Sequence, residues 1–309
     1  MEETEAQGVP SPVRLAFRVA YFGENFMGSQ LQPGLRTVEG EFIAACMRLG
    51  LFTDWRDAGF ASSGRTDRGV HALGQVMAFT TAYPERAIET LNLQLPPDLW
   101  CRSYALVSSG FHPRYDARWR TYRYYFREEG LDMDAMNAVA ALFEGVHDFA
   151  GFAKVSGKNP IRTVLSASVS REDGIVYFEV TAQSYLWHMV RCMAKALINA
   201  GTGASCAGEI EKRLYGTCEK GLHPAPPEGL VLWDVGYGIP WRRMAEGERR
   251  LAEIKGLKGY YHVMDHICEV FQKPHEYLLW EHSPEEGNYN NDITEKNTMP
   301  VPRYEGSDE

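Results

Sequence analysis

Residues 63–72 hold the strongest candidate for chemistry in this chain, a run that reads Ser-Gly-Arg-Thr-Asp-Arg-Gly-Val-His-Ala. The two glycines of the run tolerate a left-handed backbone, so a tight turn with Asp67 at its apex is expected. Arg65 and Arg68 are always charged and should keep the Asp67 carboxylate ionised. An ionised carboxylate suits a nucleophile or a base, not an acid. Because the same residue types also build ordinary solvated turns, the run alone leaves both interpretations open.

The segment 111–127 combines cations with aromatic rings: five arginines and seven aromatic residues accompany one acid, Asp116. Guanidinium groups meet phosphates and rings stack on unpaired bases, so this pattern suits single-stranded or looped RNA. Over 120–125 the alternation has the period of a strand, with Tyr122 on one face and Arg123 on the other. An aromatic-rich sheet with solvated arginines is the alternative. The arginines expected to contact RNA are Arg68, Arg114, Arg118, Arg120 and Arg123.

Hydrophobic periodicity predicts strands that alternate with helices, as in an α/β or α+β protein. Alternating apolar residues predict a strand at 13–21, and Thr37 is suited to cap the helix that follows. A hairpin is predicted over 164–181 with its turn at Glu172-Asp173-Gly174, and a helix over 186–200. We therefore expect two strand-rich lobes with mixed sheets, flanked by helices, around a central basic cleft.

The chain is expected to divide into four regions. These are a disordered N-terminus at 1–12, an N-terminal catalytic lobe at 13–107, a C-terminal lobe at 108–240 and an extension at 241–309. The extension has apolar and aromatic content enough for one or two helices. From about residue 283 it is polar and acidic, and disorder is expected there.

A net charge of −9 conflicts at first sight with an RNA partner, whose binding depends on phosphate neutralisation. Part of the excess lies in residues 241–309, which hold nine basic and fourteen acidic residues. The other acidic residues are expected to face away from the basic cleft, because local potential governs binding more than net charge does. We expect a modest affinity that depends strongly on salt.

No apolar run reaches the length of a membrane helix and residues 1–12 are unlike a signal peptide, so a cytoplasmic protein is expected. Six cysteines without Cys-x-x-Cys spacing predict reduced thiols and no structural zinc. His71 stands four residues after Asp67, a spacing that would allow a metal pair or an acid–base pair. We assign His71 a scaffold role instead, since a lone histidine in a turn is usually a hydrogen-bonding residue.

Four blocks resemble the TruA-type tRNA pseudouridine synthases in the same order. The run at 64–72 resembles that family's active-site loop. The later blocks are Phe-His-Pro-Arg at 111–114 with Arg-Thr-Tyr-Arg-Tyr at 120–124, Tyr-Leu-Trp-His-Met-Val-Arg at 185–191, and Gly-Leu-Val-Leu-Trp-Asp-Val-Gly-Tyr at 229–237. The resemblance covers about residues 13–237.

The resemblance implies the pseudouridine synthase fold and isomerisation of uridine in the anticodon stem-loop of tRNA, at positions 38 to 40. It makes Asp67 the catalytic residue and pairs it with Arg191 from the opposite lobe. Arg65 would fill the space that the extruded base leaves, Tyr122 would stack on that base, and Leu186 would wall the pocket. The tyrosine hydroxyl would assist deprotonation at C5 or order the pocket.

The implied reaction breaks the bond between ribose C1′ and base N1 and rejoins the base through C5. The oxidation state does not change, so no cofactor and no metal are expected. Asp67 would attack the sugar or remove a sugar proton to give a glycal, and the sequence leaves both routes open. The resemblance also implies a homodimer that holds one tRNA.

Two departures from the family pattern bear on target choice. Arg68 stands where bacterial members usually have alanine, so a synthase that acts at other tRNA uridines is an alternative. Trp187 and His188 stand where members vary, and no role is carried over to them.

Two other classes of protein are alternatives. A non-catalytic tRNA-binding or RNA-folding protein would keep the arginines and tyrosines but would not need Asp67. An acid-catalysed glycosidase would need two carboxylates that flank one bond, and no partner for Asp67 stands near it in the sequence.

Overall fold

The computed structural model describes residues 11–155, 157, 159–215, 222–245 and 248–272. Two compact units are present, Met1–Glu253 and Ile254–Glu309. Of the disorder expected at the two ends, residues 1–10 and 283–309 lie outside the described residues. None of the helices within the described ranges is long and apolar enough to cross a membrane.

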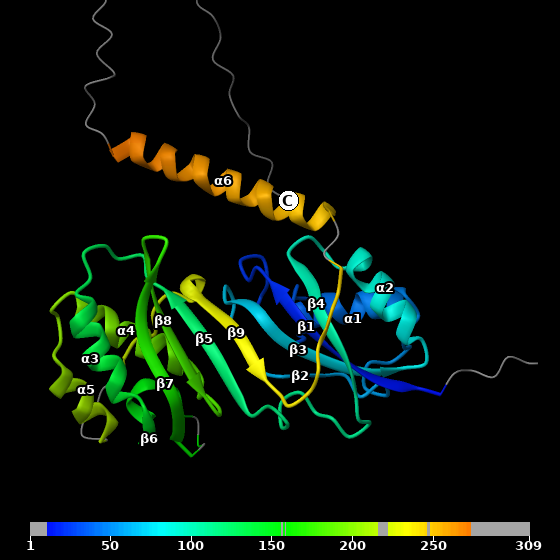
Figure 1. Ribbon diagram of the computed structural model, residues 1–309, viewed down its shortest axis with the longest axis horizontal. Coiled ribbons are helices and arrows are strands. Elements are labelled where there is room, and N and C mark those ends of the chain that lie inside the picture. The colour runs from blue at the N-terminus through cyan, green and yellow to red at the C-terminus, as the bar shows by residue number, and fades with distance from the viewer. Residues whose placement is uncertain (1–10, 156, 158, 216–221, 246–247, 273–309) are drawn as a thin grey trace, which may run out of the picture. The chain divides into compact units, whose positions relative to one another are not determined.

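The N-terminal half of the sheet has three long strands and two short ones, with two helices packed beside them (Figure 1). Its elements are β1 (Val13–Tyr21), α1 (Val38–Arg48), the short β2 (Ala61–Ser62), β3 (His71–Thr81), α2 (Pro84–Gln94), β4 (Leu99–Val107) and, returning from later in the chain, β10 (Arg242–Arg243). The strands β10, β4, β1 and β3 lie side by side in that order, and all these pairs are antiparallel.

The following part supplies the other half of the sheet. Its elements are β5 (Trp119–Tyr125), α3 (Met133–Leu142), β6 (Gly145–Asp148), β7 (Ile161–Glu172), β8 (Ile175–Ala182), α4 (Met189–Gly201), α5 (Ala207–Leu214) and β9 (Leu230–Gly236). Short 3-10 turns lie at Ala150–Phe152 and Pro227–Gly229, and α6 (Glu248–Gln272) begins in the first unit and ends in the second.

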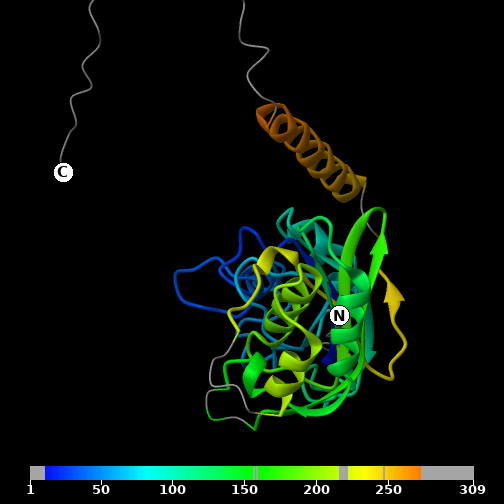
Figure 2. The same cartoon turned by 90° about the vertical axis from the view of Figure 1, so that its left-hand side faces the viewer.

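A single mixed sheet of ten strands joins the two halves, in the order β10-β4-β1-β3-β9-β5-β8-β7-β6 with β2 beside β3. The junction is the parallel pair β3–β9, where His71 lies opposite Val231 and Ala72 opposite Leu232. Helices α1 to α5 cover one face of this sheet (Figure 2). The expected mixed sheet flanked by helices is confirmed, but one sheet serves both halves. A boundary between lobes at residue 107 stays a prediction.

The strand predicted at 13–21 is β1. Its alternate side chains pack on α1: Phe17 lies 6.3 Å from Phe42 and stacks on Phe79 at 5.6 Å, measured between ring centroids. All three rings are fully buried, and burial of one such side chain contributes roughly 1.5 to 3 kcal/mol. A second cluster under β5, β7 and β8 forms around Phe143, Phe152 and Phe178. The two clusters anchor the two halves of the sheet on which the site is built.

Local signals for caps and turns are also confirmed. The Thr37 hydroxyl accepts a hydrogen bond from the Gly40 backbone N–H at 3.2 Å and caps α1. The predicted hairpin is β7–β8, and its turn residues Asp173 and Gly174 have φ of 49° and 84°. The predicted helix at 186–200 begins later, at Met189. The cause is His188, whose left-handed φ of 65° is incompatible with a helix interior.

Candidate functional site

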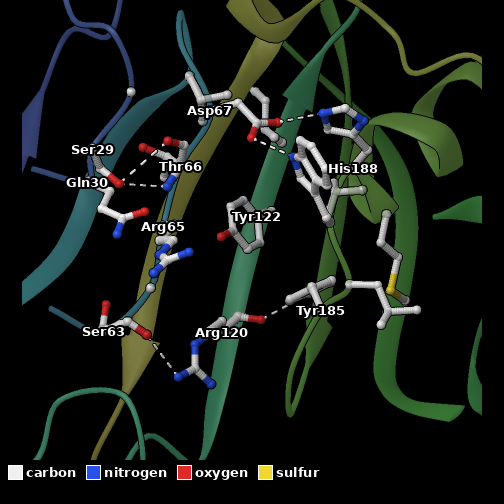
Figure 3. A pocket seen from close by; sticks show the side chains of 18 of the residues that line it. Ser29, Gln30, Ser63, Arg65, Thr66, Asp67, Arg120, Tyr122, Tyr185 and His188 are labelled. Carbon is white, nitrogen blue, oxygen red and sulfur yellow. Dashed lines mark hydrogen bonds and ion pairs between the residues drawn. The ribbon is translucent and has the colours of Figure 1, made fainter. Parts of the chain in front are cut away.

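The loop between β2 and β3 carries Asp67 (Figure 3). Hydrogen bonds of Thr66, the residue before Asp67, hold this loop against other parts of the chain. The Thr66 hydroxyl lies 2.7 Å from the Tyr21 hydroxyl, and the Thr66 N–H donates to the Ser29 hydroxyl at 2.8 Å. The Ser29 N–H in turn donates to the Thr66 carbonyl at 3.0 Å. With both its backbone polar groups and its side chain engaged, Thr66 fixes the residue that follows it.

Two glycines let the loop fold this tightly. Gly69 adopts φ of 82°, and the Val70 N–H donates to the Asp67 carbonyl at 3.2 Å to close the turn. A Cβ atom at Gly23 would lie 2.1 Å from the Val70 carbonyl oxygen. Only glycine therefore lets the segment around residue 23 pack this closely against the loop. Gly64, the other glycine of the run, does not adopt a positive φ.

Three side chains from the start of α4 converge on the Asp67 carboxylate. Arg191 Nη1 donates to Oδ2 at 3.1 Å, and Trp187 Nε1 donates to Oδ1 at 3.1 Å. His188 Nε2 lies 3.4 Å from Oδ2, a contact that Figure 3 shows. The Arg191 side chain is 12% exposed, and its Nε donates to the Ala225 carbonyl at 2.7 Å. The guanidinium therefore reaches Asp67 from a fixed position.

Arg191 thus supplies the positive charge beside Asp67. The family resemblance pairs Asp67 with Arg191, whereas the residue types of the loop suggest its neighbours Arg65 and Arg68 for this role. Both side chains are exposed, and Asp67 makes its ion pair with Arg191 instead. The Ala225 carbonyl holds the Arg191 guanidinium beside Asp67, whereas the Arg65 and Arg68 side chains are exposed to solvent.

Asp67 lies in a cavity of about 1130 Å³ lined from both halves of the sheet. The lining includes the substrate-contact candidates Arg65, Tyr122, Leu186 and Arg191 together with Asp67. Five arginines face one aspartate there: Arg65, Arg68, Arg114, Arg120 and Arg191. The cavity is therefore locally basic although the whole chain is acidic, as a polyanionic ligand requires.

Tyr122 lies in the middle of the cavity wall, on β5, between Arg65 and Tyr185 (Figure 3). Tyr185 packs edge-on against it at 5.0 Å, and the Tyr185 hydroxyl donates to the Arg120 and Val180 carbonyls. Burial raises the pKa of Tyr122 to about 12, an effect that Arg120 opposes and Asp67 adds to. The Tyr122 hydroxyl is consequently protonated at neutral pH and can act as a hydrogen-bond donor.

Arg120 holds parts of the cavity together. Its guanidinium donates to the carbonyls of Ser63 at 3.0 Å, Arg114 at 2.7 Å and Gln183 at 2.8 Å. These acceptors come from three separate segments, one of which leads into the Asp67 loop. Arg114 is exposed at the rim of the same cavity and is accessible to a ligand.

Arg118 and Arg123 do not line the cavity with Asp67. The exposed Arg118 packs its guanidinium close to Gly238, where an added Cβ would lie 2.5 Å from Nη2. Arg123 lines a different hollow, stacks over the Trp233 ring at 3.8 Å, and pairs with Glu179 at 2.6 Å. Alternation along β5 explains this, since residue 123 points away from the face on which Tyr122 lies. RNA contact by these two arginines stays a prediction.

His71 has the geometry of a scaffold residue. Its Nδ1 accepts a hydrogen bond from the Gly23 N–H at 3.1 Å, and its ring packs edge-on against Phe22. Burial lowers the pKa of His71, which keeps the ring neutral and Nδ1 free to accept. Within the described residues, no three His, Cys, Asp or Glu side chains are grouped as metal ligands.

Trp187 and His188 are the site residues that sequence reasoning missed. Both lie between Leu186 and Arg191, to which the sequence blocks gave roles in the site. The helix predicted over 186–200 would point the side chains of residues 187 and 188 in different directions, so they were not expected to meet at Asp67. The left-handed backbone at His188 breaks that pattern. Burial lowers the pKa of His188, although the nearby Asp67 carboxylate raises it.

Comparisons with known proteins agree with this geometry. Residues 139–238 match a family model described as tRNA pseudouridine synthase. The chain is 52% identical over 270 residues to "tRNA pseudouridine synthase A" of Methanoculleus marisnigri, covering 85% of this chain and 98% of the relative. It is 57% identical over 227 residues to the protein of that name from Methanosphaerula palustris, covering 74% and 81%. The Pyrococcus abyssi protein of that name is 43% identical over 276 residues, covering 87% and 98%.

Proposed function

This chain belongs to the tRNA pseudouridine synthase A family, and we propose that it isomerises uridine to pseudouridine in the tRNA anticodon stem-loop, at positions 38 to 40. One observation carries the catalytic part of the proposal. The Asp67 carboxylate is held by the Arg191 guanidinium at 3.1 Å inside a cavity that five arginines line. A paired carboxylate among cations is suited to act on a sugar carbon or sugar proton of a polyanionic substrate.

The reaction proceeds at Asp67 in either of two ways. The carboxylate attacks C1′ while the bond to N1 breaks, or it removes a ribose proton and leaves a glycal. In both cases the freed base turns within the pocket before C5 bonds to C1′. In the first route C5 displaces the Asp67 carboxylate from C1′, and in the second C5 adds to C1′ of the glycal while Asp67 returns the proton to the ribose. The C5 proton then leaves the base. Arg191 favours both routes because its hydrogen bond to Oδ2 orients the Asp67 carboxylate.

A uridine in a stem-loop must leave its stack to reach Asp67, at a cost of a few kcal/mol that contacts with the protein offset. We assign Arg65, exposed beside Asp67, to the space that the base leaves. Tyr122 stacks on the extruded base, and the buried Leu186 walls the pocket. With a pKa of about 12, the Tyr122 hydroxyl orders the pocket by donating a hydrogen bond; it is too weak an acid to supply a tyrosinate base.

Arg68 and Arg114 are our candidates for phosphate contacts, because both are exposed and line the cavity. Arg120 contributes positive potential while its donors bind backbone carbonyls. A synthase that acts at other tRNA uridines uses the same chemistry, and Arg68 at the rim is the residue that would set the difference.

We further propose a cytoplasmic homodimer that holds one tRNA. The cysteines Cys46, Cys101 and Cys192 are buried free thiols, as is usual for proteins of a reducing compartment. Light scattering on the full chain should give twice the 34.9 kDa chain mass, and a monomer would refute the dimer. Recovery of the protein in the membrane fraction of lysed cells would refute the location.

The target position is tested by mapping. Unmodified tRNA transcripts incubated with the protein should stop reverse transcriptase at pseudouridines 38 to 40 after carbodiimide treatment. Transcripts with cytidine at those three positions serve as the control. Stops at other uridines would move the target, and a protein that binds these tRNAs yet yields no stops would be a non-catalytic RNA-binding protein.

A further inference from the structure

Two donors hold the Asp67 carboxylate from opposite sides. Arg191 donates to Oδ2 and Trp187 donates to Oδ1, each at 3.1 Å. A carboxylate bound at one oxygen still turns about its Cβ–Cγ bond, a torsion whose energy profile is broad. A second donor on the other oxygen fixes the plane of the group. The indole N–H therefore restricts a motion that the ion pair alone leaves free.

Trp187 is itself well anchored, although its side chain is half exposed. The Lys154 N–H donates to the Trp187 carbonyl at 3.0 Å, which forms an isolated bridge between the two chain segments. Lys154 Nζ lies 4.5 Å from the centre of the indole ring, and the His188 ring lies 4.7 Å away on the same indole. These contacts hold the indole where its N–H meets Asp67.

The backbone after Trp187 is in an unusual conformation. His188 has φ of 65°, one of two positive values among the non-glycine residues that the structure describes. This turn ends the extended segment and starts α4 at once, so that Trp187, His188 and Arg191 all reach one carboxylate. Uncommon backbone angles that persist beside a reactive group indicate a functional constraint.

We propose that Trp187 is a positioning residue for Asp67: its indole N–H holds the carboxylate plane in the orientation that reaches the ribose. This inference rests on the proposed synthase function. The indole N–H makes the hydrogen bond to Asp67, and the ring places that N–H within reach of the carboxylate. The carboxylate keeps free lone pairs for the substrate, because two oxygens offer about four acceptor positions.

Two substitutions separate the N–H from the ring. Trp187→Phe keeps a ring without the donor, and Trp187→Gln keeps an N–H at the same number of bonds from Cβ without the ring. We expect W187F to lower kcat about tenfold with KM within about twofold of wild type, the effect of one hydrogen bond to a charged group. W187Q should retain more of kcat than W187F does. Trp55→Phe, which removes an indole that does not line the cavity, is the control.

A second readout needs no RNA. In protein with ¹⁵N-labelled tryptophan, the indole signal that W187F removes should move upfield in Asp67→Asn, because an amide oxygen is a weaker acceptor than a carboxylate. The signal that W55F removes should stay. If the chemical shift of the Trp187 indole N–H is the same in Asp67→Asn as in wild type, the contact on which the inference rests is absent and the inference is overturned.

The kinetic results separate the inference from the function beneath it. Wild-type protein that isomerises no uridine would refute the proposed function, and the positioning role would fall with it. Active wild type together with a fully active W187F, or with W187Q slower than W187F, would overturn the positioning role alone.

Discussion

Arg191 lies 3.1 Å from Asp67, although 124 residues separate the two in the chain. Asp67 stands on the loop before β3, and Arg191 on the first turn of α4. The parallel pairing of β3 with β9 brings the two halves of the sheet together beneath them. The ion pair therefore forms only when both halves of the sheet are assembled. The site is complete only in the folded protein.

Arg191→Lys should lower kcat by roughly 10- to 100-fold and leave KM nearly unchanged. A lysine lacks the separate Nε and Nη1 donors that reach the Ala225 carbonyl and Asp67, and a lost hydrogen bond to a charged group is worth about 1.5 to 3 kcal/mol. Single-turnover kinetics on tRNA measures the effect. Lys195→Arg on the same helix, outside the cavity lining, is the matched control. Equal rates for R191K and K195R would contradict the assignment.

Arg114→Ala and Arg123→Ala should differ in tRNA affinity. Loss of a phosphate contact at Arg114 should weaken binding and reduce the slope of log affinity against log salt by about one. Arg123 packs on Trp233 outside the cavity that holds Asp67, so its loss should weaken binding less than the loss of Arg114 does and should destabilise the fold by about 1 to 2 kcal/mol. Fluorescence anisotropy across a salt series and urea unfolding test both. An affinity loss for R123A as large as that for R114A would contradict this ranking of the two residues.

Tyr122→Phe should keep the dependence of kcat on pH. The pKa of Tyr122 is raised to about 12, so this hydroxyl stays protonated through pH 10 and contributes no ionisation to the profile below that value. Tyr122→Ala, which removes the stacking ring, should lose far more activity than Tyr122→Phe. Rates between pH 7 and 10 test this. An alkaline limb in wild type that disappears in Y122F would instead assign Tyr122 as the base.

Stability should fall in mild acid through His71. Burial lowers the pKa of His71 in the folded state, so below the unfolded value of about 6.5 the unfolded chain binds more protons. The stability from His71 is complete above pH 6.5 and declines as the pH falls below it. His71→Asn keeps an acceptor for the Gly23 N–H without titrating. Urea unfolding at pH 7.5 and 5.5 should show a smaller acid loss for this variant, and equal losses would exclude His71 as a cause.

Much of the fold follows from local pattern. The alternation at 13–21, the cap at Thr37 and the Asp173-Gly174 turn each report short-range chemistry, and all three agree with the structure. The continuity of the sheet was not predicted, because the β3–β9 pairing joins segments about 160 residues apart and leaves no local trace.

The site was predictable where a motif names a residue. Asp67, Arg65, Tyr122, Leu186 and Arg191 line one cavity, as the sequence blocks suggested. The site residues that the sequence blocks omitted are those whose contacts depend on side-chain orientation. The contacts of Trp187 and His188 depend on one left-handed residue that helical periodicity does not predict. Strand alternation did predict that Arg123 lies on the face opposite Tyr122, as the structure has it.

The central claim is that Asp67 carries out the isomerisation, and tritium release tests it most directly. Joining the base through C5 expels the hydrogen there, so wild-type protein should release tritium from tRNA that contains [5-³H]uridine. Asp67→Asn keeps the size of the side chain and should bind the same tRNA while releasing none above background. Release by D67N at a rate near that of wild type would contradict the account.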